Sequence, residues 1–117
     1  MDYFYVAFGG ALGSVLRFFI GHYFRFPGGT FCVNTLGSLL IGVFFVLFTQ
    51  RFDERLGLFL MTGVLGGFTT FSAFSLDLFR LLEEERFVFA LLYLLATVFG
   101  SLLMLLVGII LTRSAVS

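Results

Sequence analysis

The chain consists of four long apolar stretches separated by short polar ones. The first, roughly 3–24, ends at an arginine and the turn-forming sequence FPGG. The other three are roughly 30–50, 56–79 and 87–112. Each approaches or exceeds the ~20 residues that a helix needs to cross the hydrocarbon core of a bilayer. The pattern predicts an all-α membrane protein with four transmembrane helices in a single domain, 1–117.

The third stretch is the least regular of the four. Its residues 66–75 read GGFTTFSAFS, with glycines and hydroxyl residues where a membrane helix is normally most uniform. Broken helices are tolerated in membranes where the freed backbone lines a cavity. Freed carbonyls can hold a cation, and the new helix N-terminus can face an anion. We therefore expect the third helix to be broken near its middle, with the ring edges of Phe71 and Phe74 on one face beyond the break.

Small and polar residues follow one face of the first stretch: Gly10, Gly13, Ser14, Arg17 and Gly21. The glycines are typical of close helix packing. Arg17 differs, because a cation at the centre of a membrane helix costs at least ~2.5–3.5 kcal/mol on insertion scales. Two interpretations stay open. Its side chain either reaches back to the membrane surface or lines an aqueous vestibule that attracts anions.

Polar side chains also recur on the second and fourth stretches. Asn34 and Ser38 are one turn apart, and the amide of Asn34 offers neutral donors to an anion or to a neighbouring helix. The fourth stretch carries a stripe of mostly small and hydroxyl residues: Tyr93, Thr97, Gly100, Ser101, Met104 and Gly108. A packing seam accounts for the glycines, but a phenol in mid-span needs a polar partner.

Composition agrees with membrane insertion. Of 117 residues, 60% are hydrophobic and 12% are charged, far from the balance of soluble domains. The start of the chain does not resemble a cleaved signal peptide, so we expect it to insert as it stands. The single cysteine, Cys32, allows no intrachain disulfide.

Arginines are balanced between the two sides of the predicted membrane domain. With four spans, one side holds Arg51, Arg55 and Arg113, and the other holds Arg25, Arg80 and Arg86. Orientation follows the excess of basic residues on one side, and here neither side has an excess. The balance favours insertion in both orientations and an antiparallel homodimer. The alternative is one orientation fixed by another feature, such as the first helix.

The sequence lacks the residues that several classes of function require. Asp77 is about a turn from the end of the third stretch, and no other acidic residue lies inside a stretch. A proton-coupled cation exporter needs an intramembrane carboxylate. The sequence shows no Cys/His ligand set, no nucleophile–base pair and no phosphate-binding loop, and we expect neither an enzyme nor a nucleic-acid-binding protein.

Three segments together resemble the fluoride channel family known as Fluc or CrcB. They are GGALGSVLRF at 9–18, GTFCVNTLGS at 29–38 and GVLGGFTTFSAFS at 63–75. The resemblance covers essentially the whole chain, and the third segment is the most specific. It implies a passive, fluoride-selective channel in the cell (inner or plasma) membrane, built as an antiparallel, dual-topology homodimer with two pores.

The resemblance also implies site residues. Phe71 and Phe74 match the pore phenylalanines, Asn34 the pore asparagine, and Arg17 the arginine of the first helix. A track of hydroxyls for fluoride maps less firmly onto Thr70, Ser72, Tyr93 and Ser101. Gly66 and Thr69 match the positions whose backbone carbonyls hold a structural Na⁺ at the dimer centre. Ala73 stands where many members have Thr or Ser, so we expect no hydroxyl role there.

Two other functions remain as alternatives. A small dual-topology, proton-coupled exporter of organic cations has the same size, span number and charge balance. A non-transporting assembly subunit would use the glycine faces for packing alone, and would leave Asn34, Tyr93 and the threonines at 69 and 70 without a role.

Overall fold

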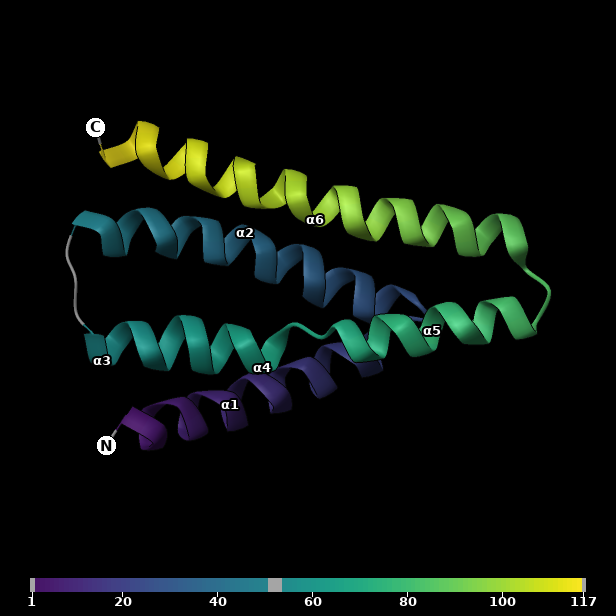
Figure 1. Ribbon diagram of the computed structural model, residues 1–117, viewed down its shortest axis with the longest axis horizontal. Coiled ribbons are helices and arrows are strands. Elements are labelled where there is room, and N and C mark those ends of the chain that lie inside the picture. The colour runs from purple at the N-terminus through teal and green to yellow at the C-terminus, as the bar shows by residue number, and fades with distance from the viewer. Residues whose placement is uncertain (1, 51–53, 117) are drawn as a thin grey trace.

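The computed structural model describes residues 2–50 and 54–116, and all its elements are helices (Figure 1). The first span is α1 (Asp2–Tyr23), the second is α2 (Gly28–Gln50) and the fourth is α6 (Phe87–Val116). The third consists of α3 (Glu54–Gly57), the π-helix η1 (Leu58–Leu65), α4 (Gly66–Phe68) and α5 (Phe71–Glu83). All four spans are long and apolar enough to cross a membrane, which confirms the predicted number. The chain is a multi-pass membrane protein.

Two spans extend beyond their predicted ends. The third continues as helix to Glu83 instead of ending near 79, and the fourth to Val116 instead of 112. Hydropathy marks where the apolar run stops. A helix can continue past that point, because its backbone hydrogen bonds are internal and do not depend on the medium. This difference moves Asp77 well inside α5.

The helices are arranged in two pairs that run side by side (Figure 1). α2 packs along α6, and α1 packs along η1 and α4. Contacts between α2 and the third span are far fewer. The two chain ends lie at the same end of the molecule (Figure 1).

Glycines allow the close approach within each pair. A Cβ on Gly13 would lie 2.8 Å from the backbone nitrogen of Phe68 and would also collide with the carbonyl of Val64. Between α2 and α6, a Cβ on Gly42 would lie 3.2 Å from the backbone nitrogen of Ile109. Because these neighbours are backbone atoms, they cannot rotate away. Gly13 thus packs closely on the face of α1 that the sequence indicated, while Gly42 was not among the glycines that it singled out.

The third span changes neighbours between its two halves. Before residue 69, Leu65 and Phe68 form a buried cluster with Val33 of α2. After residue 70, Phe74 and Leu81 form another with Ala90 and Tyr93 of α6. The residues between the clusters, Thr69 and Thr70, have extended backbone angles and belong to no helix.

Candidate functional site

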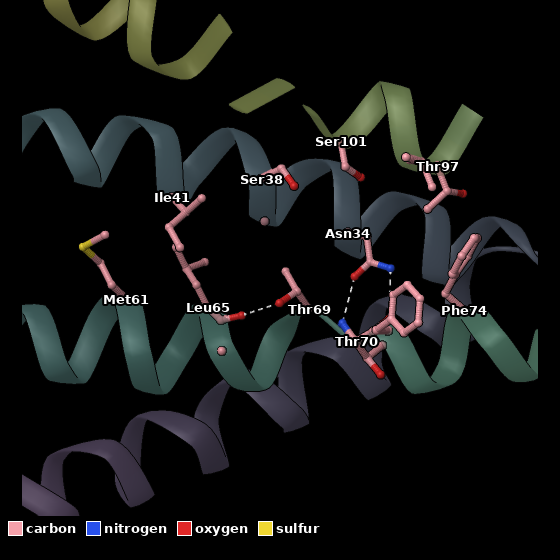
Figure 2. Close-up of a pocket in the computed structure, with 14 residues that line it drawn as sticks. Asn34, Ser38, Ile41, Met61, Leu65, Thr69, Thr70, Phe74, Thr97 and Ser101 are labelled. Atoms are coloured by element: carbon pink, nitrogen blue, oxygen red, sulfur yellow. Dashed lines mark hydrogen bonds between the residues drawn. The ribbon is translucent and has the colours of Figure 1, made fainter. Parts of the chain in front are cut away.

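The two-residue interruption in the third span is held by Asn34 (Figure 2). Thr70 donates its backbone N–H to Asn34 Oδ1 at 2.8 Å, and Asn34 Nδ2 donates to the Thr70 carbonyl at 3.0 Å. One side-chain amide thus satisfies both backbone groups of a residue that has left the helix. Asn supplies both a donor and an acceptor without a charge, which suits this pairing.

The threonines satisfy other backbone groups locally. Thr70 is the N-cap of α5, and its Oγ1 accepts from the Ala73 N–H at 3.2 Å. Its hydroxyl also lies 3.1 Å from Ser72 Oγ. On the other side of the interruption, Thr69 Oγ1 donates to the Leu65 carbonyl at 2.9 Å. The Thr70 hydroxyl thus replaces a helical acceptor at the start of α5, whereas the Thr69 hydroxyl donates to the same Leu65 carbonyl that the Thr69 N–H bonds at 3.0 Å.

The break also leaves backbone carbonyls without their helical donors, among them those of Gly66 and Thr69. The Thr70 N–H would bond the Gly66 carbonyl in a continuous helix, but it bonds Asn34. The Ala73 N–H would bond the Thr69 carbonyl, but it bonds the Thr70 hydroxyl. No other hydrogen bond to either oxygen is formed by the described residues. Neutral carbonyl oxygens of this kind fit a monovalent cation such as Na⁺.

A cavity of about 380 Å³ lies between the interruption, α2 and α6. Its polar and aromatic lining residues are Asn34, Ser38, Thr69, Thr70, Phe71, Phe74, Thr97 and Ser101, with Gly37 and Gly66 among the smaller ones. Thr97 and Ser101 lie on α6, across the cavity from the third span (Figure 2). Their hydroxyl oxygens are buried and, within the described part of the chain, have no hydrogen-bond partner. Buried hydroxyls without partners are costly, so a ligand or water is expected there.

The two phenylalanines differ sharply in exposure. Phe74 is 3% exposed, whereas Phe71 is 76% exposed, although their ring centroids are 5.6 Å apart. Phe74 packs on Tyr93 at 5.2 Å between centroids. One ring is thus fixed in the core of the single chain, and the other faces out of it.

Arg17 reaches inward from α1. Its Nε donates to the Gly67 carbonyl at 3.1 Å, beside the interruption. The side chain is part-buried and lines a second cavity of about 300 Å³, on the α1 side of the third span. Of the two interpretations, the geometry favours the inward one, because the guanidinium is held at the third span.

Tyr93 finds its polar partner in Asp77. The phenol donates to Asp77 Oδ2 at 3.2 Å, and both residues are buried, Asp77 at 8% exposure. The sequence indicated that Asp77 lies about a turn from the end of the third span, but the helix continues beyond that end and the carboxylate is buried. The reason for this difference is the extension of α5 to Glu83, which the apolar pattern did not reveal.

Most of the sequence-predicted site residues lie around one cavity. Asn34, Thr70, Phe71, Phe74 and Ser101 line it, as do Gly66 and Thr69. Ser72 and Tyr93 are outside its lining, and Arg17 lines the second cavity. Thr97 and Ser38 were not among the predicted site residues. The spacing could have identified both, because Ser38 is one turn from Asn34 and Thr97 is one turn from Ser101 on the same helix face.

The chain matches the model of one protein family over residues 4–109, described as CrcB-like protein, Camphor Resistance (CrcB). A protein of Rhizobium johnstonii named fluoride-specific ion channel FluC is 45% identical, over 93% of this chain and 94% of its own length. Proteins of the same name from Rhizobium meliloti and Helicobacter pylori are 44% and 43% identical. They match over 95% and 80% of this chain, and over 95% and 78% of their own lengths. Since both the family model and these relatives cover most of the sequence, this chain belongs to the CrcB family.

Proposed function

We propose that the protein is a passive, fluoride-selective channel that exports cytoplasmic fluoride, and is not an enzyme. The observation that carries the proposal is the cavity beside the Thr69–Thr70 interruption. Neutral groups surround it, including two buried hydroxyls without partners, and none of its lining residues is acidic. A small anion could exchange part of its hydration shell for these groups without meeting a negative charge. The relatives named fluoride-specific channels support fluoride as that anion.

We propose the cavity as the conduction path. In this view, the hydroxyls of Thr70, Thr97 and Ser101 donate to the ion, and the edges of Phe71 and Phe74 contact it without binding it tightly. Ser72 reaches the path through its contact with the Thr70 hydroxyl. Tyr93 acts indirectly, since its hydroxyl is engaged by Asp77 and its ring supports Phe74.

We further propose an antiparallel homodimer with two pores. A polar cavity open to lipid is unfavourable, and Phe71, 76% exposed in one chain, is available to line a pore shared with a second chain. The even arginine distribution supports insertion in both orientations.

We also propose a structural Na⁺ at the dimer centre. The carbonyls of Gly66 and Thr69 have lost their helical donors and would hold the ion. Two oxygens are too few for Na⁺, so a second copy would supply two more. The ion would supply a fixed positive charge at the dimer centre, and it would not be transported.

Fluoride efflux from proteoliposomes, followed with a fluoride electrode, tests the function. We expect fluoride to leave down its gradient, chloride to be nearly excluded, and flux to fall when Na⁺ is replaced by a large organic cation during reconstitution. Equal chloride flux would contradict selectivity. A fluoride flux that does not depend on Na⁺ would contradict only the cation site, and not the channel function.

One observation favours a second candidate, the proton-coupled exporter of organic cations: Asp77 is a buried carboxylate inside a span. Against it, the carboxylate is occupied by the Tyr93 phenol and does not line the cavity beside the interruption. Uptake of a lipophilic cationic dye, driven by a pH gradient and lost in Asp77→Asn, would support the exporter over the channel.

A further inference from the structure

The third span approaches the interruption as a π-helix, η1 (Leu58–Leu65). Hydrogen bonds in a π-helix close at i→i+5, so each turn holds about one residue more than an α-helical turn. The Gly66 N–H donates one such bond to the Met61 carbonyl. Beyond it the winding is α-helical, with the Thr69 N–H bonded to the Leu65 carbonyl at 3.0 Å. π-Helices are rare and mostly a single turn long, so a run of eight residues needs a physical cause.

One face of η1 is fixed by its contact with α1. A Cβ on Gly9 of α1 would meet the carbonyl of Phe59 and would lie 2.9 Å from the backbone nitrogen of Val64. Phe59 and Val64 are five residues apart, yet both approach the same glycine. In an α-helix, residues five apart point about 140° away from each other. The two residues share this contact because η1 is wound as a π-helix.

The opposite face of η1 shows the same spacing. Met61 and Gly66, again five residues apart, both line the cavity beside the interruption, and Leu65 lies between them (Figure 2). In an α-helix, Gly66 would point about 140° away from Met61 and would leave the cavity wall. Gly66 carries one of the two carbonyls that we assigned to Na⁺ above. The winding of η1 therefore determines whether that carbonyl faces the cavity.

We propose that η1 is a positioning device, in which one extra residue, held by the π winding, keeps the contact with α1 and the Gly66 carbonyl in register at the same time. Thr62 lies between the members of both pairs and is exposed, away from the cavity lining and from the contact at Gly9. Without it, both pairs would be four residues apart, the spacing that shares one face of an α-helix. The inference rests on the proposed function for the role of the Gly66 carbonyl.

A deletion and an insertion at the same point test this device. Deletion of Thr62 should let η1 rewind as an α-helix with both pairs still aligned. Insertion of an alanine after Thr62 places the pairs six residues apart, about 120° away from each other in an α-helix, so neither pair can align. Thermal unfolding is measured in NaCl and in N-methyl-D-glucamine chloride of equal ionic strength, because a bound cation raises the unfolding midpoint. Fluoride efflux from proteoliposomes is measured in parallel.

We expect the Thr62 deletion to keep at least about half of the Na⁺-dependent rise in the unfolding midpoint, and efflux within about threefold of wild type. The insertion should abolish the rise and slow efflux at least about tenfold, since the carbonyl is then misplaced. Thr62→Ala should behave as wild type, which separates the side chain from the spacing. Deletion of Leu102, a 55% exposed residue of the α-helix α6, controls for chain shortening. It should be as harmful as the insertion, because it turns Gly108 about 100° away from its contact with α2.

Equal damage from the deletion and the insertion at Thr62 would overturn the proposal, because an ordinary α-helix loses its register by about 100° in either direction. A deletion variant that folds and conducts but no longer responds to Na⁺ would also overturn it, since the winding would then not position the Gly66 carbonyl. A wild type without a Na⁺ response would refute the cation site and with it the assigned role of η1. A wild type that releases no fluoride would refute the channel function, and the unfolding midpoints would still decide the inference.

Discussion

At the scale of single residues, neighbouring side chains on the same turn have different tasks. Phe74 is part of the buried cluster with Leu81, Ala90 and Tyr93, while Phe71 is exposed in the single chain. A substitution of Phe74 should therefore act mainly on stability, and a substitution of Phe71 mainly on conduction.

Replacing Phe74 by alanine should lower the free energy of unfolding by roughly 3–5 kcal/mol, the usual cost of emptying a buried phenylalanine site. Phe71→Leu should leave the unfolding midpoint in detergent almost unchanged. It should still reduce fluoride efflux at least about tenfold, equivalent to about 1.4 kcal/mol on the barrier. If Phe71→Leu conducts normally in proteoliposomes, the exposed ring does not line the path.

We predict that Asn34 stabilises the protein through its hydrogen bonds to the backbone of Thr70. Asn34→Ala removes two hydrogen bonds to Thr70 and leaves both backbone groups without partners, at a cost of about 1–3 kcal/mol for each. Thermal unfolding and efflux should both show the loss. Thr35→Val is the matched control, since among the described residues the Thr35 hydroxyl bonds only to carbonyls within its own helix. A similar loss in the control would point to helix packing instead.

At the scale of the elements, the glycine contacts set the distance between helices. Gly13→Ala should destabilise the protein by about 1–3 kcal/mol, because the new methyl group meets the backbone at Val64 and Phe68. Gly57→Ala is its control, because a Cβ there meets nothing within 4 Å. The control should be neutral or up to ~1 kcal/mol more stable, from helix propensity. Equal effects on the unfolding midpoint would show that close packing of α1 is unimportant.

The sequence predicted the four spans well, because membrane crossing depends on hydropathy and length, which are local properties. Most of the site residues that it indicated also line the cavity beside Thr69 and Thr70. It did not reveal that Asn34 bonds the backbone of Thr70, or that Asp77 is buried against Tyr93. These pairs join residues 36 and 16 positions apart. They depend on which helix faces meet, and helix periodicity does not determine this.

At the scale of the whole molecule, added basic residues should change the orientation of the chain in the membrane. A lysine cluster added after the C-terminus should force a single orientation, because the two sides start with equal numbers of arginines. Reporter fusions measure the orientation. We expect this variant to lose fluoride efflux when expressed alone, and to recover it with a partner biased the other way by Glu84→Lys and Glu85→Lys. Full activity of a single-orientation population would exclude the antiparallel dimer.

The length of α6 sets how the protein sits in its membrane. Its apolar part, roughly 87–112, corresponds to about 39 Å of helix, against a hydrocarbon core of about 30 Å. Such a helix tilts to match the bilayer, and thinner bilayers demand more tilt. Thr97 and Ser101 lie on this helix, so a change of tilt moves their hydroxyls relative to Asn34 and the third span. The length of the lipid acyl chains should therefore affect ion passage.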